Sequence, residues 1–203
     1  MAEIHDLVQS GIKITKQMQN IPFFEVVKAT TNFHFYSMNL KDPQDLEVFN
    51  EITVSANNLI KYIKSTGTGY KGNRINEVGR NIERVFVEEL KKSKLKPSQL
   101  TTPGYPDIKI IDSFGRATFL ESKAVSQDWK STFRSFYYTG GKKIDADARH
   151  LLIGWDVSKE SGEYWVVKGW KLVDLSKLMV DTKMEFHSNN KQIYTADLII
   201  AQL

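Results

Sequence analysis

The stretch PDIKIIDSFGRATFLESK, residues 106–123, carries the strongest structural signal in the sequence. Two runs rich in apolar and β-branched residues flank a polar segment that ends in glycine, and this pattern predicts a β-hairpin. We expect a three-residue loop at positions 113–115, with Gly115 in the left-handed conformation and Asp112 paired with Arg116. That loop determines which residues of the two strands face each other.

The predicted pairing places Asp107 directly opposite Glu121 on the neighbouring strand. Directly opposed residues project to the same face of a sheet, with Cβ atoms roughly 4.5–5.5 Å apart. Lys123 lies two residues beyond Glu121, so we expect its side chain on that face too. Two carboxylates at this separation can bind one divalent cation, whereas a two-residue loop would shift the register by one residue and separate them.

The second strand of this hairpin is expected in the interior of a sheet, because it is apolar on both faces. Phe119 and Val125 share the face of Glu121, while Leu120 and Ala124 lie on the other. A charged group in such a strand is costly unless it is paired or bound to a metal ion. The alternative is a solvated Glu–Lys pair on an edge strand, but a Pro-Asp pair at the matching distance favours a functional site.

An amphipathic helix is predicted upstream of the hairpin. Asn73 can cap its start, and apolar residues then recur at helical spacing. These residues are Ile75, Val78, Ile82, Val85, Phe86 and Leu90. Glu83, at the edge of this stripe, is a candidate carboxylate for the site, and Glu77 is the alternative. Gly79 fits either a functional role or close packing of the helix against a strand.

Pro106-Asp107, thirteen intervening residues and Glu121-Ser122-Lys123 together resemble the PD-(D/E)XK nuclease superfamily. The segment Asn76-x-x-Gly79-x-x-x-Glu83 is similar to the glutamate-bearing helix that usually precedes this hairpin, so the motif region spans residues 73–125. Within the superfamily, the chain looks most like a type II restriction endonuclease. The resemblance implies an α/β fold with a restriction-endonuclease-like core, in which helices flank a central mixed β-sheet.

The same resemblance implies a role for each motif residue. Asp107 and Glu121 would ligate Mg²⁺, and the main-chain carbonyl of Ser122 is often a further ligand. Lys123 would position or deprotonate the attacking water and offset charge at the phosphate. Glu83 would hold a second metal ion or a water at the metal. Whether one or two ions bind stays open.

The implied function is a Mg²⁺-dependent type II restriction endonuclease that cuts both strands of a short specific DNA site. A homodimer is expected, because two-fold symmetric DNA sites are commonly matched by two-fold symmetric proteins. One alternative is a structure-selective repair or recombination nuclease of the same superfamily. Another is a DNA-binding module without catalysis, which the intact Asp107, Glu121 and Lys123 argue against.

Polar and basic residues after the hairpin are candidates for contacts with DNA phosphates and base edges. The first group is Gln127, Lys130, Arg134, Lys142 and Lys143, and the second is Asn189, Asn190 and Lys191. The alternative for the first group is an ordinary amphipathic helix and loop. The alternative for the second is a turn before a strand.

The composition narrows the classes of protein that need to be considered. A net charge of +4 mildly favours a polyanionic partner. The absence of cysteine excludes thiolate zinc sites, and the four histidines are too scattered for a histidine–metal nuclease. No nucleotide-binding glycine loop is present. We expect a cytoplasmic location, since neither a signal peptide nor an apolar run long enough to cross a bilayer is seen.

The 203 residues are predicted to form a single nuclease domain, 1–203. Residues 1–66 are expected to be mainly helical, and residues 73–203 are expected to form the catalytic core after a glycine-rich loop. Further elements of the core are expected from pattern and turn signals. They are strands at 150–157 and 164–172, a short helix at 172–180 and a final strand at 192–200.

Overall fold

The structure is a computed structural model that describes residues 2–66, 70–126, 129, 136–186, 188–193 and 195. The chain divides into two compact units. The larger unit is Pro22–Leu178, and the smaller unit combines Met1–Ile21 with Met179–Leu203. The whole predicted hairpin and the helix before it belong to the larger unit.

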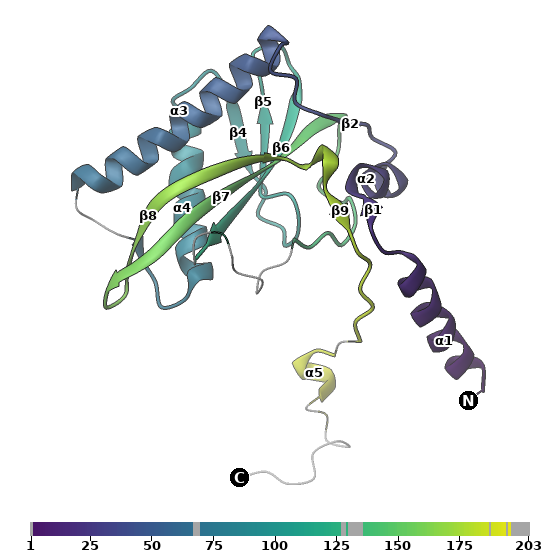
Figure 1. Cartoon of the computed structure of the whole chain (residues 1–203). Coiled ribbons are helices and arrows are strands. Elements are labelled where there is room, and N and C mark those ends of the chain that lie inside the picture. Colours follow the sequence, from purple (N-terminus) through teal and green to yellow (C-terminus); the bar gives the residue numbers. More distant parts are fainter. Residues whose placement is uncertain are drawn as a thin grey trace. The chain divides into compact units, whose positions relative to one another are not determined.

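A seven-stranded mixed sheet forms the centre of the larger unit (Figure 1). Its main path runs β3-β8-β7-β6-β5-β4, and β2 pairs with the start of β7. The strands are β2 (Phe35–Tyr36), β3 (Tyr70–Lys71), β4 (Lys96–Gln99), β5 (Ile108–Ile111), β6 (Ala117–Val125), β7 (Ala148–Ser161) and β8 (Tyr164–Asp174). β7 is parallel to β6 and β2, and the other pairs are antiparallel.

Helices α3 (Pro43–Thr66) and α4 (Ile75–Leu90) pack together, with α4 against β6 and α3 against β8. Figure 1 shows the long strands β7 and β8 curving across these helices. The predicted stripe of α4 is confirmed, because Val78, Ile82, Phe86 and Leu90 are fully buried. This arrangement confirms the predicted α/β class, a mixed central sheet flanked by helices.

The start of α4 differs from the prediction. Its cap position is Arg74, with no capping hydrogen bond from the side chain, so the prediction of Asn73 as the cap was wrong. Instead, the main-chain N–H of Asn73 donates to the Glu77 carboxylate at 2.9 Å. Glu77 therefore holds the residue that precedes the cap and fixes the entry of the chain into the helix.

A cluster of aromatic rings covers the other face of β6, where Phe119 is buried. Phe23, at the start of α2 (Phe23–Thr31), is the centre of this cluster. It makes edge-to-face contacts with Phe35, Tyr105, Phe136 and Tyr138. β6 is thus covered on both faces, as its apolar pattern predicts.

Buried charges connect the turn of the hairpin to the first turn of α3. The Arg116 side chain lies 2.7 Å from Asp112 and 3.1 Å from Asp45, and Asp45 also pairs with Arg149. Asp45 is only 2% exposed, so these ions are paired inside the protein. This network supports the hairpin from the end of the sheet near its turn.

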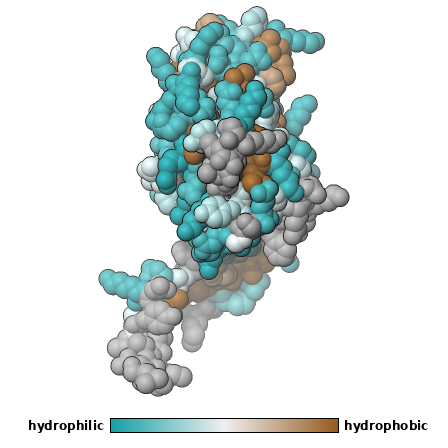
Figure 2. Space-filling view, turned by 90° about the vertical axis from the view of Figure 1, so that its left-hand side faces the viewer, coloured by the Kyte–Doolittle hydropathy of each residue, from teal (hydrophilic) through white to brown (hydrophobic). Residues whose placement is uncertain are grey.

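The smaller unit contains α1 (Ala2–Gln17), β9 (Met179–Val180) and α5 (Asn190–Ile193). β9 pairs with β1 (Ile21–Pro22) in a two-stranded sheet. No helix in the described part of the chain is long and apolar enough to cross a membrane. Figure 2 shows one side of the molecule, where hydrophilic side chains predominate and smaller apolar patches lie between them.

Two predicted elements near the C-terminus were wrong in the described residues. The expected helix at 172–180 begins as strand, since β8 continues to Asp174 and only Leu175–Lys177 forms a 3-10 turn. The Asp174 carboxylate accepts from the Ser176 N–H at 2.8 Å and so starts that turn. The expected strand at 192–200 begins in α5, and most of its remainder lies outside the described residues.

Candidate active site

The hairpin has the predicted turn and register. Gly115 has a φ of 79°, and the Asp112 N–H donates to the Arg116 carbonyl at 3.1 Å. Ile108 pairs with Leu120, and the Asp107 N–H donates to the Leu120 carbonyl at 3.2 Å. The same register, extended by one residue, places Asp107 opposite Glu121. The loop chemistry thus determines which carboxylates meet.

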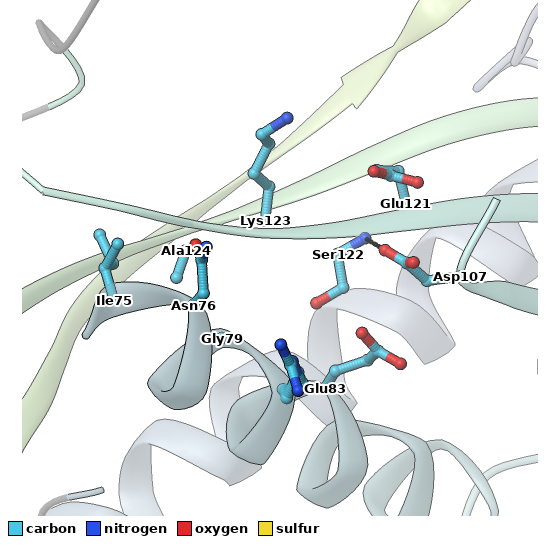
Figure 3. Close-up of a pocket in the computed structure, with 10 residues that line it drawn as sticks. Ile75, Asn76, Gly79, Glu83, Asp107, Glu121, Ser122, Lys123 and Ala124 are labelled. Carbon is cyan, nitrogen blue, oxygen red and sulfur yellow. Dashed lines mark hydrogen bonds between the residues drawn. The ribbon is translucent and has the colours of Figure 1, made fainter. Parts of the chain in front are cut away.

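The Asp107 carboxylate is held between the two strands. Its Oδ2 accepts a hydrogen bond from the Ser122 N–H at 2.9 Å. Figure 3 shows Glu121 and Lys123 on one side of β6, while Ser122 points to the side of α4. The Ser122 hydroxyl accepts a hydrogen bond from the Trp155 indole at 3.0 Å, which fixes this part of β6 to the core.

A cavity of about 300 Å³ lies between α4 and β6 and includes these residues. Glu83 borders it from α4 and points toward Asp107 (Figure 3). The Glu83 carboxylate accepts a hydrogen bond from Gln99 on β4 at 2.6 Å. Glu77 does not border the cavity. Of the two candidate helix carboxylates, the structure therefore brings Glu83 to the hairpin.

The helix comes this close because of Gly79. A Cβ atom built on Gly79 would lie 3.3 Å from the Cβ of Ala124 on β6. Such a separation is tighter than an ordinary van der Waals contact, so any larger side chain would separate helix and strand. The structure supports the packing explanation of Gly79, and that packing brings Glu83 near the hairpin.

Three carboxylates share this region, and the pKa of each is raised. Burial, followed by the charge of Asp107, raises the pKa of Glu121 to about 8. Burial also raises the pKa of Asp107, against the lowering effect of the Ser122 hydrogen bond and the charge of Lys143. Burial, then the charge of Asp107, raises the pKa of Glu83. The site therefore favours a bound cation, which offsets this negative charge.

The donor atoms fit a hard divalent cation. Oε2 of Glu121 is buried and has no hydrogen-bond partner among the described residues. Within that same part of the chain, no group of three histidine or carboxylate side chains has metal-site spacing. Mg²⁺ typically takes one or two carboxylates and completes its shell with water and substrate phosphate. Asp107 and Glu121 match that pattern.

Sequence comparisons support the same activity. Residues 14–197 match the type II restriction enzyme MjaV family. The chain belongs to this family. It is 30% identical over 210 residues to the type II restriction enzyme MjaV of Methanocaldococcus jannaschii, which covers 93% of this chain and 91% of that protein. No solved structure matches the chain.

Membership of the MjaV family confirms the predicted type II restriction endonuclease. Enzymes of this type are site-specific deoxyribonucleases, so the substrate is DNA and the reaction is phosphodiester hydrolysis. They generally require a divalent metal ion, in agreement with the paired carboxylates. The family match includes α4 and the whole hairpin.

The predicted DNA contacts of this MjaV family member lie in several places. Lys142 is exposed, while the Lys143 ammonium binds main-chain carbonyls of the segment before Asp107. Asn189 and Lys191 are exposed in the smaller unit, and Asn190 is the first residue of α5. Three further candidates lie outside the described residues: Gln127, Lys130 and Arg134.

Two further residues of α4 border the cavity of this MjaV family member: Asn76, which begins the motif segment of this helix, and Arg80, which was not singled out from the sequence. Arg80 lowers the pKa of Glu83 through its charge. Asn76 and Arg80 both lie three or four residues from Gly79 or Glu83, so helical spacing was a usable signal. His150 does not border this cavity. It is buried in the aromatic cluster, where its Nδ1 is 2.7 Å from the Tyr105 hydroxyl.

Proposed function

We propose that this enzyme cleaves both strands of a short specific DNA site with Mg²⁺ held by Asp107 and Glu121. The observation that carries the proposal is the buried, unpartnered Oε2 of Glu121, set opposite Asp107 across the hairpin among the described residues. The Ser122 main-chain carbonyl is a further candidate ligand. The proposed catalytic residues all lie within Pro22–Leu178.

Each of the motif residues is proposed to have a different role at the scissile phosphate. The Ser122 N–H orients the Asp107 carboxylate. Lys123 lies on the same side of β6 as Glu121, where its side chain would position the attacking water as an ammonium or deprotonate it as a neutral amine (Figure 3). When bound, Mg²⁺ would lower the pKa of a coordinated water molecule and neutralise the charge that develops on the phosphate.

Glu83 is proposed to hold a second ion or an ordered water on the α4 side of the cavity. Its half-buried carboxylate faces Asp107 and is fixed by Gln99. Arg80, one turn earlier on the same helix, borders the same cavity and is exposed. We assign Arg80 to a DNA phosphate, because one guanidinium group can donate two parallel hydrogen bonds to two oxygens of a phosphate.

Recognition of the site sequence is assigned to the polar residues after the hairpin. Lys142, Asn189, Asn190 and Lys191 can contact backbone or base edges, as can Gln127, Lys130 and Arg134. These assignments rest on residue chemistry. Substituting a base-reading residue would relax the sequence preference, whereas substituting a phosphate contact would weaken binding to all sequences similarly.

A homodimer is proposed for the active enzyme. Exposed apolar residues recur along α1 and just after its end, at alternating three- and four-residue spacing around Gly11, which matches the seam of paired helices. They are Ile4, Leu7, Ile14 and Met18. A second copy of the chain presents the same stripe, and a two-fold dimer has one active site for each DNA strand.

The direct test is digestion of several long DNAs by the purified protein, with Mg²⁺ and with EDTA. We expect sharp, reproducible fragments with Mg²⁺ and intact DNA with EDTA. Asp107→Asn is the matched variant, since it keeps the side-chain shape and removes the charge. Cutting only at flaps or junctions would instead identify a structure-selective nuclease, and metal-independent cutting would exclude the proposed chemistry.

A further inference from the structure

The segment that leads into Asp107 is closed on itself. The Leu100 N–H donates to the Asp107 carbonyl at 2.7 Å, so residues 100–107 form a loop whose last residue is the proposed metal ligand. β4 ends at Gln99 and β5 begins at Ile108, so this loop joins two paired strands. Its conformation therefore decides how Asp107 enters the hairpin.

Lys143 fastens this loop from outside. Its ammonium donates to three main-chain carbonyls: Leu100 at 3.3 Å, Pro106 at 2.6 Å and Gly104. An ammonium has three hydrogens, so these acceptors use its whole donor capacity. They come from the start, the late middle and the end of the loop. One side chain thus holds three points of the loop together.

Lys143 is itself held firmly by its neighbours. Ile144 is 4% exposed, and its N–H donates to the Gly141 carbonyl at 2.9 Å. Both carboxylate oxygens of Asp145 accept from the Lys109 ammonium at 2.7 Å. Lys109 is two residues beyond Asp107 on β5. The segment that carries Lys143 is therefore anchored to the same strand whose entry Lys143 controls.

We propose that Lys143 is a positioning residue for Asp107: by holding the Leu100, Gly104 and Pro106 carbonyls, it sets the Asp107 carboxylate opposite Glu121. The inference rests on the proposed function of Asp107 as a metal ligand. The Pro106 carbonyl belongs to the peptide that precedes Asp107, so a shift of that peptide moves the carboxylate directly. Groups that orient metal ligands commonly change metal affinity when they are removed.

A phosphate contact is the competing role for this lysine. Removal of a phosphate contact weakens DNA binding and reduces its salt dependence, but leaves metal affinity unchanged. Removal of a positioning residue lowers metal affinity and leaves DNA binding nearly unchanged. Lys142, exposed and adjacent in sequence, is the matched control, because its ammonium is not bonded to the loop carbonyls in the structure.

The test compares Lys143→Met and Lys142→Met with the unaltered protein in three measurements on the full chain. Calorimetry measures Mn²⁺ binding without DNA, hydrogen exchange follows the amides of residues 100–107, and DNA affinity is measured in Ca²⁺. We expect Lys143→Met to lower Mn²⁺ affinity by about 10- to 100-fold and to speed exchange in the loop. At saturating Ca²⁺, DNA affinity should change less than about 3-fold, because the phosphate contacts remain. Lys142→Met should leave metal affinity and loop exchange unchanged.

Unchanged Mn²⁺ affinity and unchanged loop exchange in Lys143→Met would overturn the inference, as would a loss confined to DNA affinity. If the Met variant does not fold, Lys143→Gln replaces it in the same measurements. The Gln amide has two N–H donors where the ammonium has three, so this variant is the milder change. If the unaltered protein binds no Mn²⁺ and cuts no DNA, the proposed function fails. In that case, hydrogen exchange of residues 100–107 alone tests Lys143. Unaltered exchange in Lys143→Met would reject its role in holding the loop.

Discussion

The main-chain N–H of Ser122 donates to the Asp107 carboxylate at 2.9 Å, across the two strands of the hairpin. This bond joins Asp107, in the first half of the nuclease motif, to Ser122 in its second half. It also faces the carboxylate toward Glu121, whose Oε2 is buried without a hydrogen-bond partner among the described residues. The register and hydrogen bonding of the hairpin thus bring the two carboxylates together.

Glu121→Gln tests whether that oxygen binds the metal ion. The amide keeps the shape of the side chain and removes its charge, so the fold should be preserved. Loss of a metal ligand should slow single-turnover cleavage by at least about 100-fold, since metal stabilisation of the transition state is worth several kcal/mol. In EDTA above about pH 8, where the Glu121 carboxylate is ionised, the variant should be at least as stable as the unaltered protein, because a buried charge has been removed. Wild-type cleavage by this variant would exclude Glu121 as a ligand.

The raised pKa of Glu121 predicts a pH effect on the metal-free protein. Its pKa of about 8 lies above the ordinary value of 4.5, so the folded state binds this proton more tightly than the unfolded state. The contribution to stability is fully present below about pH 4.5 and is lost as pH rises toward 8. Urea unfolding in EDTA at several pH values measures it, and Glu121→Gln should reduce the dependence.

The same proton competes with the metal ion. Binding of a cation to Glu121 requires the ionised carboxylate, so metal affinity should rise with pH up to about 8. Higher Mg²⁺ should then shift the pH profile of cleavage to lower pH. A profile that does not move with Mg²⁺ concentration would contradict this competition.

The hairpin was predictable because its decisive interactions are local. Gly115 and Asp112 specify the loop within a few residues, and the register follows from that loop. The role of Lys143 was not predictable, because a lysine after a glycine pair has the sequence pattern of a DNA contact. Only the tertiary fold brings its ammonium to carbonyls about forty residues earlier.

The short strands were missed for a related reason. β2 and β3 contain two residues each, and each forms only by pairing with a long strand. β4 contains Pro97 and is an edge strand, where the missing N–H of proline is tolerated. Such segments carry too few residues for a periodic pattern, so their structure depends on partners far away in the sequence.

Gly79 provides a test of the packing that brings Glu83 to the site. Gly79→Leu should lower the free energy of unfolding by about 1–3 kcal/mol, because its side chain collides with Ala124 on β6. Gly79→Ala should cost less, since its single methyl needs only a small shift. Both should slow cleavage by moving α4, in the same order. Urea unfolding and single-turnover rates measure the two effects, and a fully active Leu variant would contradict the assigned packing.

Arg80 is expected to act on DNA rather than on the metal. Arg80→Ala should weaken DNA binding in Ca²⁺ and reduce the slope of log affinity against log salt by about one. Mn²⁺ affinity without DNA should be preserved. Arg84→Ala is the matched control, because Arg84 is exposed on the same helix but does not border the cavity. Equal effects of the two variants would reject a specific phosphate contact.

The apolar stripe of α1 predicts how the enzyme assembles. Leu7→Glu places a charge in the middle of the stripe, so it should convert a dimer into a monomer. Gln9→Glu adds the same charge two residues away, on a different side of the helix, and should leave the dimer intact. Light scattering measures the mass, and plasmid assays should show loss of double-strand cuts in the Leu7 variant alone. A single-chain mass for the unaltered protein would exclude the proposed homodimer.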